Sequence, residues 1–152
     1  NLDSRNMEEL VKLFVEDVRV GGKESGREAL KQWFIRTMSV PKVSIHFVAN
    51  HTIVMDDADN AHGVVYCYDQ LERPDLGEWQ YGFLQYWDKY VRRNGEWQFF
   101  RRKFHRWYIC DALTRPFNGA GNVDQNNTLT THQLPDAFPS WGRFWKEQAV
   151  KS

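Results

Sequence analysis

The stretch Ser44-Ile45-His46-Phe47-Val48-Ala49-Asn50-His51 alternates with a period of two, as a half-buried β-strand does. One face carries Val43, Ile45, Phe47 and Ala49, and the other carries Ser44, His46, Val48 and Asn50. His46 therefore stands in mid-strand, on the face that would look into a cavity if the sheet curls. A hydrogen-bonded core histidine is the simplest interpretation of a lone His here. A catalytic interpretation depends on whether the chain brings chemical partners to it.

The whole chain has the size and charge of one globular domain. Its 152 residues include 20 basic and 20 acidic side chains, so the balanced charge gives no reason to expect nucleic acid or an anionic membrane as a partner. No apolar run reaches the roughly 18 residues that a membrane-spanning helix needs. Cys67 and Cys110 lie in no metal-binding spacing, and a reduced, cytoplasmic protein is expected. The seven Trp, six Tyr and ten Phe suit an apolar pocket, an ordinary core or a subunit interface.

Helix and strand patterns flank the His46 strand. Met7, Leu10, Val11 and Phe14 have amphipathic helical spacing, with Ser4 as a candidate N-cap, and a second helix is predicted over residues 27–38. Strands are predicted over residues 43–55, 61–73, 79–93 and 96–109, and Asn94-Gly95 is a strong hairpin signal. Helices followed by an antiparallel meander indicate an α+β domain.

Two further segments bear on metals and on the tail. Residues 56–60 read as an acidic turn that lacks the Gly and the final Glu of a calcium loop, so no metal is expected there. Asn118 to His132 is rich in Gly, Asn and Thr and is expected to be exposed. A short terminal helix is predicted beyond it, with Trp141, Phe144 and Trp145 on one side. That helix would close a pocket, clasp a neighbouring subunit or pack on its own sheet.

Cationic side chains alternate along the last predicted strand. By parity, one face carries Phe100, Arg102, Phe104, Arg106 and Tyr108, and the other carries Arg101, Lys103, His105 and Trp107. One face must meet the apolar side of the sheet, so a cation is expected near the cavity, where a buried Arg requires an anionic or polar partner. The alternative is that these are surface charges whose aliphatic stems cover the sheet.

Three short motifs resemble the SnoaL-like branch of the nuclear-transport-factor-2-like (NTF2-like) superfamily. They are Leu2-Asp3-Ser4-Arg5 with the helix after it, Ser44-Ile45-His46-Phe47, and Arg93-Asn94-Gly95-Glu96-Trp97-Gln98-Phe99. Over about residues 1–109 they are similar to the scytalone dehydratases, lindane dehydrochlorinases and bile-acid 7α-dehydratases of that branch. The resemblance implies a cone-shaped α+β barrel, in which N-terminal helices pack against a curved, mostly antiparallel sheet. This domain is expected over residues 1–112, with residues 113–152 as a C-terminal extension of it.

The resemblance also implies residue roles. Asp3 and His46 match the catalytic dyad of those enzymes, and Arg102 matches an Arg five residues after the hairpin-strand Trp. Neutral His46 would take a proton from an activated carbon, while Asp3 fixes its tautomer and stabilises the imidazolium. Arg102 would stabilise the leaving group or a developing enolate. The residues expected to bind substrate are Tyr66, Tyr68, Tyr86, His105 and Trp107.

The activity that follows is a cofactor-independent lyase of the dehydratase type, or an isomerase or cyclase. Its substrate is expected to be a small, largely apolar cyclic molecule, and its assembly a homotrimer or homodimer, because both recur in the family. The alternative is a non-catalytic subunit or a small-molecule-binding module with the same fold. A pocket on which Asp3, His46 and Arg102 converge would favour the enzyme, whereas a pocket filled by the chain's own rings would favour the alternative.

Overall fold

The fold is an α+β arrangement, seen in a computed structural model that describes residues 1–113 and 138–149. The elements are α1 (Met7–Lys12), β1 (Arg19–Val20), β2 (Glu24–Ser25), α2 (Arg27–Met38), β3 (Val43–Met55), β4 (Asn60–Arg73), β5 (Glu78–Arg93), β6 (Glu96–Asp111) and α3 (Pro139–Ala149). The predicted α+β class is confirmed, with the helices and long strands close to their expected positions. The Gly- and Asn-rich stretch from Asn118 to His132 lies outside the described residues.

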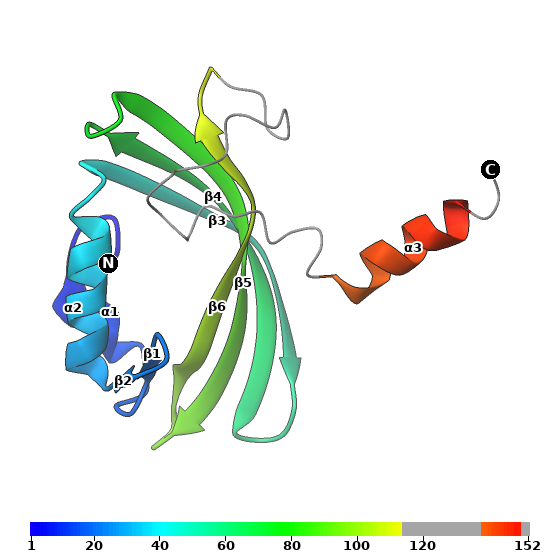
Figure 1. Ribbon diagram of the computed structural model, residues 1–152. Helices are drawn as coiled ribbons and strands as arrows, with labels where there is room; N and C mark the ends of the chain where they lie inside the picture. Colours follow the sequence, from blue (N-terminus) through cyan, green and yellow to red (C-terminus); the bar gives the residue numbers. More distant parts are fainter. Residues whose placement is uncertain (114–137, 150–152) are drawn as a thin grey trace.

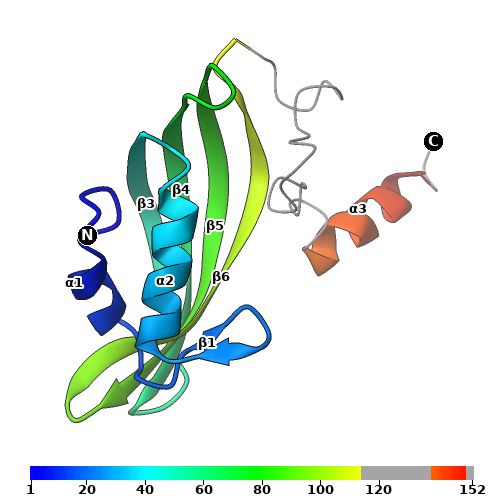
Figure 2. The ribbon, with the colours of Figure 1, turned by 60° about the vertical axis from the view of Figure 1, so that its left-hand side comes forward.

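The main sheet is a four-stranded antiparallel meander in the order β3-β4-β5-β6. It curves around α1 and α2, which lie on its concave side (Figure 1). The short strands β1 and β2 pair with each other beside the lower end of α2 (Figure 2). Within the described residues β3 and β6 do not pair with each other, so the expected cone-shaped barrel is a curled, open sheet.

Helix α1 begins later than the sequence predicts. Its N-cap is Asn6, whose side chain accepts a hydrogen bond from the Glu9 amide at 3.4 Å, and not Ser4. The Ser4 hydroxyl instead donates to the Asn1 carbonyl at 3.1 Å. Arg5 has a positive φ of 58°, so the chain turns here before the helix starts. The residues before α1 therefore form a turn that is free to approach β3.

The hydrophobic core lies between the helices and the hairpin end of β5 and β6. Its members are Val11, Phe14, Val15, Val18, Val20 and Leu30, with Ala29, Trp33, Phe34, Val91 and Phe99 packed against them. The Phe14 and Phe99 rings stack with centroids 5.0 Å apart. The Val15 amide donates to the Phe99 carbonyl at 3.1 Å, and the Phe99 amide donates to the Leu13 carbonyl at 2.8 Å. The chain after α1 is thus attached to the β6 edge.

Breaks in register decide which side chains share the concave face. Residues directly opposite each other on paired strands project to the same side. In the β3–β4 pair, Val48 is opposite Cys67 and His51 is opposite Val65, so β3 carries one extra residue between them. This β-bulge turns His51 to the same face as His46, where uninterrupted alternation would place it on the other.

A second break, in the β5–β6 pair, corrects one prediction. Leu84 is opposite Arg106, but the next residue back, Phe83, is opposite Tyr108. Tyr108 therefore lies on the outer face with Phe83, and the expectation that it shares a face with Arg102 and Arg106 is wrong. The cause is the extra residue, Trp107, that the register shift leaves between the two pairs.

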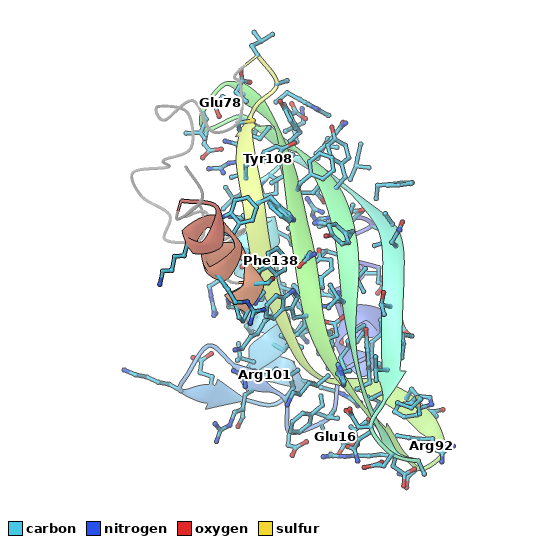
Figure 3. All side chains as sticks on the ribbon, turned by 90° about the vertical axis from the view of Figure 1, so that its right-hand side faces the viewer. Glu16, Glu78, Arg92, Arg101, Tyr108 and Phe138 are labelled. Carbon is cyan, nitrogen blue, oxygen red and sulfur yellow. The ribbon has the colours of Figure 1, made fainter. Side chains whose placement is uncertain are left out.

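Helix α3 lies on the convex, outer side of the sheet (Figure 1). Phe138, just before it, packs beside β6 (Figure 3), with its ring centroid 5.6 Å from Trp107 and 6.2 Å from Trp87. Trp141 is exposed, while the side chains of Phe144 and Trp145 lie outside the described part. The helix thus starts on the face opposite His46. None of the described helices is both long and apolar enough to cross a membrane.

Candidate active site

The concave face carries a hydrogen-bonded Asp–His pair on the edge strand β3. Asp3 Oδ1 lies 2.5 Å from His46 Nδ1, and Asp3 Oδ2 accepts from the backbone amide of His46 at 2.8 Å. An ionised carboxylate only accepts hydrogen bonds, so the ring proton resides on Nδ1 and the lone pair on Nε2. The pair therefore has the geometry of a general base held by an orienting carboxylate.

Two residues that the sequence analysis left without a role hold Asp3 in place. Ser44 Oγ donates to Asp3 Oδ1 at 2.9 Å, and Arg5 Nη1 donates to Ser44 Oγ at 2.6 Å. Arg5 Nη2 also donates to the Pro41 carbonyl at 3.0 Å, which fixes the turn against the start of β3. The strand alternation that puts Ser44 on the His46 face was the available signal for its role.

These contacts decide the charge of Asp3. Partial burial opposes its ionisation, but hydrogen bonds from the His46 ring, the His46 amide and Ser44 outweigh that burial. The pKa of Asp3 is therefore held below its usual value. Asp3 is a carboxylate at neutral pH, as an orienting group must be.

A second carboxyl, Asp69 on β4, faces the same imidazole. Asp69 is the direct partner of His46 in the β3–β4 register and is 3% exposed. Its Oδ1 makes no hydrogen bond to any described residue. Burial raises the pKa of Asp69, although Arg106 and His46 act against that rise. A buried carboxyl with a raised pKa is suited to hold a proton and donate it.

Space for the Asp69 carboxyl comes from a glycine on β5. Gly82 is the next residue across from Asp69, and a Cβ atom there would overlap Asp69 Oδ1 and approach the Tyr108 carbonyl to 3.2 Å. Asp69 could not be recognised from the sequence, because it reaches His46 through the register of the β3–β4 pair. The residues of one strand do not determine which residues of the next strand lie opposite them.

Arg102 lies on the concave face but is bound to a carboxylate of its own. Its Nε donates to Asp88 Oδ1 at 2.8 Å and its Nη2 to Asp88 Oδ2 at 2.7 Å, a bidentate ion pair. The guanidinium carbon lies 4.1 Å from the Tyr86 ring centroid and 4.4 Å from that of Phe99. On β5, Asp88 lies opposite Arg102, and Gly82 lies opposite Asp69. These two positions of β5 are roughly 20 Å apart along the strand. The structure therefore does not bring Arg102 to the His46 ring.

Arg106 is the β6 cation at the His46 end of this face. It is opposite Leu84 in the register and interacts electrostatically with Asp69. Burial lowers the pKa of Arg106, and the Asp69 charge counteracts this. Arg102 and Arg106 share a face, so parity alone did not distinguish them in the sequence.

The residues expected to bind substrate are divided between the two faces. Tyr86 lies on the concave face, where burial raises its pKa and keeps the phenol neutral. The registers place Tyr66, Tyr68 and His105 on the outer face, away from His46, and the Trp107 ring packs against Phe138 on that side. Tyr68 packs against Phe83, with centroids 4.9 Å apart, and the His105 ring lies 4.2 Å from that of Trp87. These rings cover the outside of the sheet.

A shallow apolar hollow of about 520 Å³ lies on that outer face. Its lining residues are Phe47, Ala49, Asn50, Tyr66, Cys67, Tyr68 and Phe83. Phe47 is 65% exposed there. The hollow contains no ionisable pair comparable to Asp3 and His46, so it offers binding surface without acid–base chemistry. Across residues 1–113 and 138–149, no three His, Cys, Asp or Glu side chains converge to hold a metal ion.

A curled antiparallel sheet with helices on its concave side defines the NTF2-like class of α+β domains. Within it, the chain belongs to the SnoaL-like domain family, whose sequence model matches residues 1–103. The family resemblance seen in the three motifs is thereby confirmed. No curated protein matches the chain with significance.

Solved structures agree with this assignment. A protein from Novosphingobium aromaticivorans assigned as a scytalone dehydratase is 25% identical, with a TM-score of 0.63 over 75% of this chain and 79% of that one. LinA is 18% identical, with a TM-score of 0.67 over 75% of this chain and 81% of that one. The hexachlorocyclohexane dehydrochlorinase LinA-type3 from Novosphingobium barchaimii is also 18% identical, with a TM-score of 0.67 over 75% and 82% of the two chains. The last two show likeness of fold.

Proposed function

We propose that this protein is a cofactor-independent dehydratase, which eliminates water from a small, largely apolar cyclic substrate that carries a carbonyl beside an acidic C–H. The observation that carries the proposal is the His46 imidazole, held at Nδ1 by Asp3 and faced by the buried carboxyl of Asp69. A lone pair on Nε2 offers a proton acceptor, and the Asp69 carboxyl, whose pKa burial raises, is the proposed proton donor. Membership of the SnoaL-like family and the 25% identity to the scytalone dehydratase-like structure support the same class.

The proposed reaction balances with the protein's own groups. His46 Nε2 takes the proton next to the substrate carbonyl, and the electron pair of that C–H bond forms the new C=C bond. The C–O bond breaks, and the departing oxygen takes the proton of Asp69 and leaves as water. Asp3 stabilises the imidazolium. Return of the proton from His46 to the Asp69 carboxylate restores both groups.

Arg106 is proposed to take the charge-stabilising role that the family resemblance implied for Arg102. It already interacts with Asp69, whereas Arg102 is paired with Asp88. Once Asp69 has given up its proton, the guanidinium opposes the new negative charge. Isomerisation would use the same base, with His46 returning the proton to a different carbon of the substrate. In a cyclisation, the carbanion would attack a second carbonyl carbon of the substrate, and His46 would return the proton to that carbonyl's oxygen.

The test uses two probes, a β-hydroxycyclohexanone and its β-acetoxy counterpart, and follows the ultraviolet absorbance of the enone product. Wild-type protein is expected to form enone, and His46→Gln is expected to lower the rate by roughly 10²–10⁴-fold with either probe. His62→Gln is the matched control, because His62 is exposed and pairs with Asp56 at 2.7 Å, away from the site. Equal rates in wild type and His46→Gln would contradict the mechanism.

The two leaving groups separate the acid from the base. Acetate departs without a proton, whereas hydroxide requires one. Asp69→Asn is therefore expected to lose elimination of water while keeping most elimination of acetate. Loss of both to the same degree would mean that Asp69 supports the structure of the site and donates no proton.

A non-catalytic binding module is the second candidate, and the apolar hollow on the outer face favours it. Binding there would quench or shift the fluorescence of the neighbouring tyrosines, and His46→Gln would leave that binding unchanged. A cytoplasmic homodimer or homotrimer remains part of the prediction. Gel filtration with light scattering tests the assembly.

A further inference from the structure

A second histidine on the concave face begins a chain of four hydrogen-bonded side chains. His51 Nε2 on β3 lies 3.0 Å from Tyr90 Oη on β5. Tyr90 Oη donates to Asp88 Oδ2 at 2.9 Å, and Asp88 holds Arg102 of β6 in the bidentate pair. The chain begins at the exposed imidazole of His51 and ends at the guanidinium of Arg102. Its third member, Asp88, has no exposed side-chain surface.

The protons in this chain have one arrangement. The single proton of Tyr90 goes to Asp88, so the phenol oxygen accepts from His51, and Nε2 of His51 carries hydrogen. Burial, followed by the charge and hydrogen bond of Asp88, raises the pKa of Tyr90 and keeps the phenol protonated, although the charge and hydrogen bond of Arg102 act against that rise. A further proton on His51 therefore binds at Nδ1, and the imidazolium then donates more strongly to Tyr90.

Two features of the backbone make the contact possible. The β-bulge turns His51 to the concave face, and Gly63 on β4 lies beneath the meeting point of His51 and Tyr90. A Cβ atom at Gly63 would come within 2.5 Å of the Thr52 carbonyl, 3.2 Å of His51 Nε2 and 3.3 Å of Tyr90 Cε2. One extra residue and one missing side chain therefore shape this contact.

We propose that His51 and Tyr90 are positioning residues for Arg102, and that protonation of His51 is transmitted to the Arg102 guanidinium through Tyr90, which interacts with both Asp88 and Arg102. Hydrogen bonds in a chain polarise one another, and more so in a buried setting of low dielectric constant. Histidine is the side chain that ordinarily changes charge between about pH 5 and 8. Among the described residues of the sheet, the titratable group in contact with His51 is Tyr90, and Asp88 and Arg102 lie behind it on β5 and β6. Strand β4 presents the uncharged Gly63 and Val65 to His51.

Nuclear magnetic resonance tests the transmission without any substrate. The Nε–H resonance of Arg102 and the ring resonances of His51 are followed between about pH 5 and 8. In wild type, the Arg102 resonance is expected to shift with the same midpoint as the His51 ring. Tyr90→Phe keeps the ring and removes the hydroxyl, so His51 should still titrate while the Arg102 shift disappears. His62→Gln should leave both unchanged.

The proposal is overturned if the Arg102 resonance is insensitive to His51 in wild type, or if its shift persists in Tyr90→Phe. His51→Gln replaces an exposed side chain and carries the test if Tyr90→Phe does not fold. It should abolish the Arg102 shift and retain the Arg102 resonance itself. Because no turnover is measured, failure of the proposed dehydration would leave this result intact.

Discussion

His46 and Asp69 are direct partners across the β3–β4 pair, and their side chains leave the sheet on the same face. Asp3 reaches the same imidazole from the turn before α1. For Asp3, partial burial is outweighed by hydrogen bonds and the pKa is lowered, whereas burial raises the pKa of Asp69. Two carboxyls whose pKa values are moved apart in this way can divide the roles of orienting group and proton donor.

Replacing Asp3 by Ala should slow elimination by roughly 10²–10⁴-fold, because His46 loses the acceptor that fixes its tautomer. Ser44→Ala removes one of the hydrogen bonds to Asp3 and leaves the carboxylate and its bond to His46. A clearly smaller loss of kcat is therefore expected. Equal losses in the two variants would mean that the turn, and not the carboxylate, is what matters.

Asp69→Asn should make the protein more stable than wild type at neutral pH. An unfolded Asp ionises near pH 3.9, whereas the folded pKa of Asp69 is raised. Its contribution to stability is full below the unfolded value and is lost as the pH rises through the folded pKa. Asn does not ionise, so urea unfolding should show the gain at neutral pH and little difference at strongly acidic pH.

The opposite result for Asp69→Asn is equally informative. A variant less stable than wild type at neutral pH would show that Asp69 is ionised and stabilised by Arg106. That outcome would remove the proton donor from the proposed mechanism and leave the His46–Asp3 pair unaffected.

Local structure could be predicted from the sequence, and strand pairing could not. The alternation of apolar and polar residues predicted the β3 strand and placed Ser44 and His46 on one face, since this pattern depends on one strand alone. Asp69 reaches His46 through the register of the β3–β4 pair. Arg106 approaches Asp69 through the β4–β5 and β5–β6 pairs, and a bulge shifts the β5–β6 register by one residue. The sequence did not predict that Tyr66 and Tyr68 face outward, because a tyrosine that lines a pocket and a tyrosine on the outer face of a sheet are the same residue in the sequence.

Asp88→Ala should lower the free energy of unfolding by about 3–5 kcal/mol, because it leaves the mostly buried Arg102 without its counter-charge. Asp17→Ala is the matched control. Asp17 pairs with Arg93 at 3.0 Å on the surface, where its side chain is 68% exposed, so little change is expected. Chemical denaturation of both variants checks the contrast. Comparable losses would contradict the burial of the Asp88–Arg102 pair.

Gly82→Ala should destabilise the protein by about 1–3 kcal/mol, since the new methyl group overlaps Asp69 Oδ1. It should also disturb proton donation from Asp69 more than binding of substrate. Gly22→Ala is the control, because a Cβ at Gly22 meets nothing within 4 Å. Thermal unfolding of the two variants measures the difference, and equal melting temperatures would mean that Asp69 can move aside.

The extra residue of β3 changes the curvature of the strand, and removing it would leave the side chains of β3 facing the same way. Deleting Asn50 would restore a regular count between Val48 and His51, so both histidines would still point inward. The bend and added twist of the bulge would be lost. The β3 edge of the sheet would flatten, but the same side chains would face inward in the same order. The depth of the concave face can therefore change over evolution without a change in the residues that line it.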